Sequence, residues 1–149
     1  MAIASVLQNT FKEELLKGYH SFLASGGSAF KIALYTSSAD LTTTTTVYIT
    51  TAEVASGGGY TTAGEALTNT GVAKSTVTSY TDFSDVSWTS ASFTARGCMI
   101  YNSSSISGLT ANSTVCTIDF GGDKTVSSGT FTIQFPANDS SNAIIRITS

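Results

Sequence analysis

The chain has 149 residues, of which 41% are hydrophobic and only 11% are charged, and its formal net charge at pH 7 is −3. This length predicts a single domain that buries a core without disulfides, and serine and threonine, about a third of the residues, must cover much of its surface. The scattered lysines and arginines argue against nucleic-acid binding, and no apolar run is long enough for a membrane helix.

The N-terminal region, residues 1–28, is predicted to form a helical arm with one amphipathic helix over residues 5–24. Phe11, Leu15 and Phe22 lie at approximately helical spacing and form one apolar stripe. This stripe either covers an open face of the chain's own sheet or docks on a neighbouring subunit, so we take these three side chains as candidate interface residues.

The expected helix carries start and stop signals of different strength. Thr10 followed by Glu13 fits a capping box, in which each side chain bonds the backbone of the other. Gly18 weakens the middle of the predicted helix, and the glycine pair at 26–27 is expected to end it.

Residues 29–149 are predicted to form a β-sandwich domain, which packs with the arm as one globular unit. The run 30–35 reads as the first strand, with one strongly apolar face. Further strands are expected over residues 72–80, 83–88, 93–101, 115–120, 130–135 and 143–148. Short strands separated by Gly, Ser and Asn turns favour a jelly-roll-like sandwich, so the fold class is mainly β with one N-terminal α-helix.

Three connections stand out in composition. Residues 37–46 form a threonine-rich loop, and the three glycines at 57–59 predict a mobile or sharply bent connection. The glycine pair at 121–122, flanked by Asp119 and Asp123, reads as a β-hairpin turn.

The sequence presents no assembled reaction site, so no catalytic, cofactor-binding or metal-binding residues are assigned and the protein is not expected to be an enzyme. His20 is the single histidine, and no nucleophile motif accompanies it. Asp82 and Asp85 read as turn residues that accept backbone hydrogen bonds, although a calcium site or paired-carboxylate catalysis would use the same residue types. Cys98 and Cys116 read as free buried thiols.

The only two arginines, Arg96 and Arg146, lie inside apolar strands. Each is expected either to pair with an aspartate of the same chain or to reach a partner subunit, because arginine is enriched at interfaces. A different binding mode would use aromatic side chains to stack on a glycan, with Tyr35, Tyr48, Tyr60, Tyr80 and Trp88 as candidates. Their placement in strands favours a role in the core.

A set of short motifs is spread over nearly the whole chain. They comprise residues 11–16 (FKEELL), 30–36 (FKIALYT), 59–60 (GY), 83–88 (FSDVSW), 93–97 (FTARG), 119–124 (DFGGDK), 129–131 (GTF), 135–138 (FPAN) and 143–147 (AIIRI). Together they resemble those of small structural proteins of tailed bacteriophage particles. These are packing and turn residues, so they indicate the group and carry no catalytic residue.

The resemblance implies a virion component assembled in a bacterial cytoplasm, consistent with an N-terminus that lacks the layout of a secretory signal. The expected function is capsid decoration, in which the protein binds the major capsid protein and stabilises the shell. A location in the tail, at the head–tail junction or at a fibre base, with or without glycan binding, is the alternative. The expected partners are other virion proteins and further copies of this chain, with no nucleic acid, membrane or cofactor.

Overall fold

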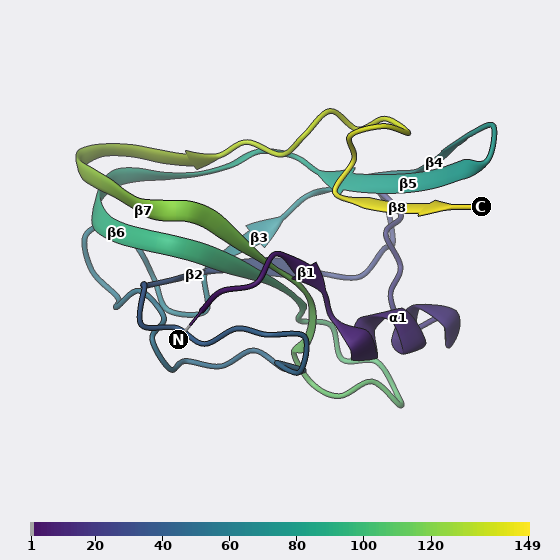
Figure 1. Cartoon of the computed structure of the whole chain (residues 1–149), viewed down its shortest axis with the longest axis horizontal. Helices are drawn as coiled ribbons and strands as arrows, with labels where there is room; N and C mark the ends of the chain where they lie inside the picture. The colour runs from purple at the N-terminus through teal and green to yellow at the C-terminus, as the bar shows by residue number, and fades with distance from the viewer. Residues whose placement is uncertain (1) are drawn as a thin grey trace.

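The computed structural model describes residues 2–149, which form a mainly β, sandwich-like fold with one short helix near the N-terminus (Figure 1). The predicted fold class is therefore confirmed. One sheet has five strands in the order β1-β7-β6-β2-β3, and the other has three in the order β4-β5-β8. The elements are β1 (Val6–Leu7), α1 (Asn9–Leu16), β2 (Phe30–Tyr35), β3 (Glu65–Leu67), β4 (Asn69–Ser75), β5 (Thr78–Phe83), β6 (Val86–Asn102), β7 (Ser113–Ile133) and β8 (Ile145–Thr148).

The antiparallel ribbon of β6 and β7 contributes to both layers. In Figure 1 it runs leftward through the lower layer, turns over at the left, and returns in the upper layer towards β4, β5 and β8. The turn coincides with shifts in register, of which the largest places the single residue Arg96 of β6 opposite residues 120–123 of β7. Because extra residues on one strand bend and twist a ribbon, these bulges let two long strands form two stacked layers.

The lower arm of the ribbon is buried on both faces. Towards the upper layer lies the main core, in which Ile32, Leu34 and Ile100 have no exposed surface. On the opposite face, Tyr35 and Met99 pack with other side chains of a second cluster covered by the loop at residues 36–60. The prediction that the strand at 30–35 has one apolar face was therefore incomplete, since the threonine-rich loop packs over its second face.

The predicted helix over residues 5–24 was too long, since α1 covers only Asn9–Leu16. The residues before it form β1, which pairs with β7, and the residue preceding the helix is Gln8 rather than the predicted cap Thr10. Gly18 adopts φ +78° and ends the helix, while the following residue, Tyr19, donates its backbone N–H to Glu14. This left-handed glycine stop is common after helices, and it explains why Gly18 does not lie inside one.

Several predicted strand boundaries also needed correction. The expected runs 115–120 and 130–135 belong to one strand, β7, so the glycine pair at 121–122 forms a bulge and not a hairpin turn. The run 72–80 contains most of β4, a turn and the start of β5, and the run 83–88 is divided between β5 and β6. The first predicted β-strand, in contrast, agrees with β2 at both ends.

Candidate binding surface

An apolar groove of about 720 Å³ lies between the two layers, where the arms of β7 diverge. Ile118 and Phe120 of the lower arm face it from one side, and Phe131 and Ile133 of the upper arm face it from the other. These four side chains are half-buried, unlike Ile100 and Val115 further from the bend, which have no exposed surface. The remaining lining is Cys98, Lys124, Thr132, Gln134, Phe135, Pro136 and Ile144.

The outer edge of β7 beside this groove has no partner strand over residues 120–133, within the part of the chain that the structure describes. Before that segment, β1 occupies the edge by pairing Val6 with Thr117 and Leu7 with Cys116. The last bond to the N-terminal segment is the donation from the Asp119 backbone N–H to Ser5 Oγ, at 2.9 Å. We call residues 120–133 the open edge of β7.

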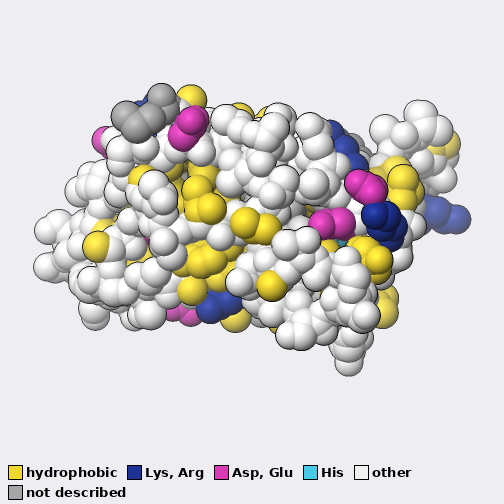
Figure 2. All heavy atoms as spheres, turned by 90° about the horizontal axis from the view of Figure 1, so that it is seen from below, with side chains coloured by type: hydrophobic (Ala, Val, Ile, Leu, Met, Phe, Trp, Pro, Cys, Tyr) yellow, Lys and Arg dark blue, Asp and Glu magenta, His cyan; other side chains and the backbone are white. Residues whose placement is uncertain are grey.

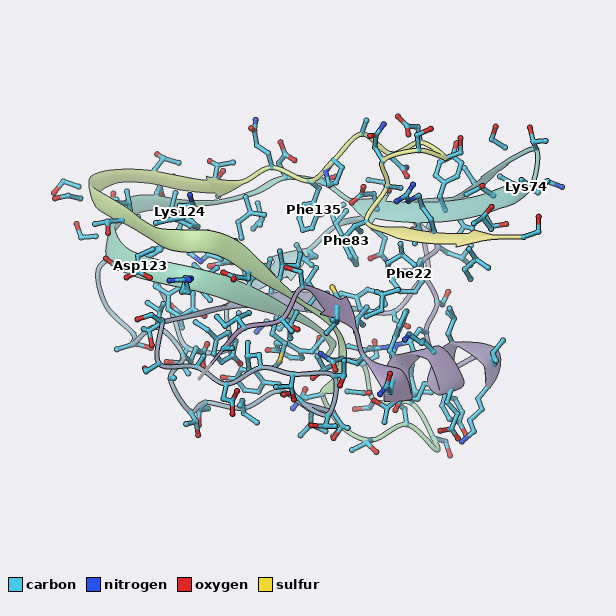
Figure 3. All side chains as sticks on the ribbon, viewed as in Figure 1. Phe22, Lys74, Phe83, Asp123, Lys124 and Phe135 are labelled. Carbon is cyan, nitrogen blue, oxygen red and sulfur yellow. The ribbon has the colours of Figure 1, made fainter. Side chains whose placement is uncertain are left out.

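The bend between the arms carries a small group of charged side chains. Arg96 Nε donates to Asp119 Oδ1 at 3.1 Å, and Arg96 Nη1 lies 3.6 Å from Asp123 Oδ1. A hydrogen bond from the Gly121 backbone, assisted by Arg96, holds the pKa of Asp119 below its usual range. Lys124 lines the groove and has no ion pair among residues 2–149. Figure 3 shows Lys124 at the bend, with Phe135 and Phe83 further along the space between the layers.

A smaller apolar cleft of about 290 Å³ lies between the end of α1 and the three-stranded sheet. Leu23, Val72 and Ile147 line it and are each more than half exposed. Seen from below, the surface has few charged side chains, and most of them gather at the end that carries α1 (Figure 2). Among the described residues that line this cleft there is no lysine, arginine, aspartate or glutamate, whereas Lys124 lines the larger groove.

His20 lies inside a hydrogen-bonded cluster that fixes its proton. Asn102 accepts from the Ser104 backbone through Oδ1, so its amide N–H donates to His20 Nδ1 at 3.0 Å. His20 Nε2 then donates to Glu14 Oε2 at 2.9 Å, and Ser113 Oγ donates to the same oxygen at 2.6 Å. Burial lowers the pKa of His20, against the raising effect of Glu14.

This arrangement does not have the geometry of a catalytic triad. The Ser113 hydroxyl donates to the carboxylate and not to the imidazole, so the histidine cannot take its proton. The two ring nitrogens of His20 are bonded to Glu14 and Asn102, and not to Asp82, Asp85, Asp119 or Asp123, which a triad with this histidine would use. Instead, the cluster ties α1 to the ends of β6 and β7, which is a structural role.

Glu53 is the centre of a second polar cluster, which closes the loop over the lower layer. Its carboxylate accepts hydrogen bonds from the hydroxyls of Tyr48 and Tyr60, at 2.6 and 2.7 Å, and from the Ala63 backbone at 2.8 Å. The Tyr60 hydroxyl also accepts from the Leu34 backbone of β2. Burial raises the pKa of Tyr60, and it raises that of nearby Tyr101 to about 12. These phenols therefore act as neutral hydrogen-bonding groups.

The candidate interface residues have different positions. Phe11 and Phe22 are buried in the chain's own core, where Phe22 stacks on Phe30 with ring centroids 4.6 Å apart. Leu15 is half-buried and lines the smaller cleft. Arg96 pairs within the chain, and Arg146 donates to the Ser141 carbonyl. The apolar stripe was expected either to cover the chain's own sheet or to dock on a neighbouring subunit. Its two phenylalanines cover the chain's own sheet.

The other candidate side chains also have structural contacts. Asp82 accepts from the backbones of Phe83 and Ile144, and Asp85 accepts from the backbone of Phe135. Tyr35, Tyr60 and Trp88, three of the aromatics considered for glycan stacking, are 2% exposed or less, while Tyr48 and Tyr80 are half-buried. Cys98 and Cys116 are free and buried, as predicted, and burial raises the pKa of Cys98.

Sequence reasoning did not identify the groove or the open edge of β7. Alternation of apolar residues at 118 and 120, and at 131, 133 and 135, gave the signal for an inward-facing strand. It could not reveal that these positions lie on two arms of one strand with space between them.

Across residues 2–149, no cluster of three or more His, Cys, Asp or Glu side chains is placed to hold a metal ion. Over the same residues, none of the helices has the length and apolar character required to cross a membrane. Comparison with protein-family models, curated proteins and solved structures found no match.

Proposed function

We propose that this protein is a non-enzymatic structural component of a tailed-bacteriophage particle, where it binds the major capsid protein and stabilises the shell as a decoration protein. The proposal begins from the resemblance of motifs between residues 11 and 147 to small virion proteins. Physical features of the fold support an assembly role independently of that resemblance.

The single observation that carries the proposal is the open edge of β7 beside the apolar groove. An exposed strand edge readily pairs with another chain, and monomeric proteins usually cover, shorten or charge such an edge. Here the edge runs past half-buried Phe120 and Phe131 and carries little charge. A surface of this kind fits a protein that completes its fold against a neighbour.

The polar side chains support the same interpretation. His20, Glu53, Asp82 and Asp85 each satisfy backbone or side-chain partners within the fold. Because only 11% of the residues are charged, burial of the surface against a partner would remove few charged groups from water. Repeated binding to an ordered shell favours a symmetric oligomer, so we expect copies of this chain to associate on the particle.

Copy number tests the proposal directly. Particles of the phage that encodes the chain are purified, and the molar ratio of this protein to the major capsid protein is measured by quantitative mass spectrometry. A decoration protein is expected at a ratio on the scale of the shell protein itself. A handful of copies per particle would overturn the shell role and favour the tail, the head–tail junction or a fibre base.

A deletion provides the functional measurement. Particles that lack the protein are expected to release DNA at lower temperature and after milder osmotic shock, while adsorbing to host cells normally. Purified wild-type protein, added back to those particles, is the matched control and should restore stability. Normal stability together with failed adsorption would contradict the decoration role and support receptor binding.

A further inference from the structure

The open edge of β7 and the groove beside it form one continuous surface, and we propose that this surface receives a single extended strand from a neighbouring protein. The strand pairs with residues 120–133, places alternate apolar side chains in the groove, and presents an acidic side chain to Lys124. This inference rests on the proposed function for the identity of the donor, whereas the site is defined by residues of this chain alone.

The fold already uses the same edge to bind a strand. Val6 and Leu7 of β1 pair with β7, and Ser5 still accepts a bond from Asp119. The chain then turns away, since the Ala4 backbone donates to Leu41 on the loop that covers the lower layer. A donated strand would therefore continue the line that β1 begins, with its backbone satisfying the N–H and C=O groups that β1 leaves free.

The groove matches the side-chain period of a strand. Residues 131–136 line one wall, where the large apolar side chains Phe131, Ile133 and Phe135 occupy every second position, and Ile118 and Phe120 have the same spacing on the other wall. A paired strand directs every second side chain to the same face, with a repeat close to this spacing. Alternate valine, isoleucine or leucine residues of the donor would bury these half-exposed walls.

The charge at the bend sets the orientation of the donor. Asp119 and Asp123 lie against Arg96, whereas Lys124 has no ion pair among residues 2–149. Figure 3 places Lys124 at the closed end of the space between the layers and Lys74 at the opposite tip of the molecule. A donor strand with an acidic side chain at one end should therefore bind most tightly when that end lies at the bend, next to Lys124.

A strand fits this surface better than two other occupants. A lipid-like amphiphile could fill the groove and reach Lys124, but it would leave the backbone groups of the open edge unpaired. A second copy that placed its own groove against this one would leave both concave surfaces unfilled. A donated strand satisfies the edge, the groove and the lysine together.

The test uses the intact chain and a fluorescein-labelled synthetic peptide that alternates valine and threonine and ends with glutamate, because a strand that pairs antiparallel to β7, as β1 does, has its C-terminal end at the bend. Fluorescence anisotropy measures binding to the wild-type protein, to Lys124→Glu and to Lys74→Glu. Both lysines are exposed, so both variants should fold, which circular dichroism and a urea titration verify. We expect saturable binding that Lys124→Glu weakens by about two- to fivefold, the scale of one exposed ion pair, with Lys74→Glu close to wild type.

Two further measurements locate the peptide. A second peptide with lysine in place of glutamate should bind Lys124→Glu better than it binds the wild-type protein. Hydrogen exchange, followed by mass spectrometry, should slow at residues 120–133 when peptide is present. Absence of saturable binding, equal effects of the two lysine variants, or protection of a different strand would each overturn the proposal.

The peptide assay needs no phage particle, so its failure can be distinguished from failure of the proposed function. If the peptide does not bind but the protein is abundant on the shell, the strand-docking surface is wrong and the decoration role stands. If the peptide binds as expected but particles contain few copies, the docking surface stands and the donor must lie elsewhere in the particle.

Discussion

The two arms of the β6–β7 ribbon differ in how completely the chain covers them. In the lower arm, Ile100 and Val115 have no exposed surface, because the upper layer packs on this face and the loop at 36–60 covers the other. In the upper arm, Phe131 and Ile133 are half-buried beside the open edge of β7, which no strand of residues 2–149 covers. Residues 98–101 of β6 in the lower arm are apolar without interruption, whereas residues 130–133 of β7 in the upper arm alternate threonine with an apolar residue, so local sequence and the surrounding segments both contribute to the difference.

The largest expected effect tests whether the lower arm carries most of the stability. Ile100→Ala removes methylene groups from a closed core and should lower the free energy of unfolding by about 2–5 kcal/mol. Ile133→Ala makes the same chemical change in the upper arm, where part of the side chain already meets solvent, and should cost about 1 kcal/mol. Urea unfolding followed by circular dichroism measures both values, and equal losses would contradict the contrast between the arms.

The next effect concerns the loop that covers the lower arm. Glu53→Gln replaces one accepting oxygen with an amide that faces the hydrogen-bond donors Tyr48, Tyr60 and Ala63, so some of them lose their partner. We expect the free energy of unfolding to fall by about 1–3 kcal/mol. Glu65→Gln, at an exposed position of β3, is the matched control and should leave stability unchanged. If Glu53→Gln left the free energy of unfolding unchanged, apolar packing alone would be holding the loop in place.

A pH titration of protein stability probes the contact that His20 makes between α1 and the lower arm of the ribbon. Its folded-state pKa lies below 6.5, chiefly because the ring is buried, so the unfolded chain binds the proton more readily. Stability from this group is complete above pH 6.5 and is lost as the pH falls through the folded-state pKa. Urea titrations of wild type and His20→Gln at several pH values should show a shallower acid dependence in the variant. If the free energy of unfolding fell with pH equally in both proteins, His20 would not be the group that causes the loss of stability in acid.

The smallest expected effect lies at the bend that joins the arms. Arg96→Ala removes the ion pairs with Asp119 and Asp123, both of which are partly exposed. The free energy of unfolding should therefore change by less than about 1 kcal/mol. Amide exchange at residues 119–124 should nevertheless become faster, because the bulge loses the side chain that spans it. Arg146→Ala serves as a control, since Arg146 bonds to Ser141 away from the bulge.

The sequence predicted those parts of the fold that depend on residues close together in the chain. The strand at 30–35 was placed correctly because β-branched, aromatic and aliphatic residues run without a turn signal. The helix was too long because its apolar spacing continues into Phe22, whereas the left-handed stop at Gly18 ends it. Pairing of β1 with β7 is a long-range contact and left no local sign.

The glycines show why the remaining features were not predictable. The pair at 121–122 has the composition of a turn, but the register of β6 makes it a bulge within β7. The glycines at 57–59 form a tight turn, where a side chain on Gly58 or Gly59 would collide with the carbonyls of Ser92 and Thr89. In both cases a strand distant in sequence determines the local structure, and the groove depends on the same long-range geometry.

The doubled-back ribbon also has a consequence for how the chain folds. Its hairpin end joins Asn102 to Ser113 through the loop at residues 103–112, and further pairs follow along the ribbon as far as Val86 and Ile133. Once this loop has closed, the further pairs of the ribbon form without closing a new loop, whereas pairs such as β1 with β7 close a much longer one. We therefore expect folding to nucleate at this hairpin and to reach the bend, and hence the second layer, only late in the process.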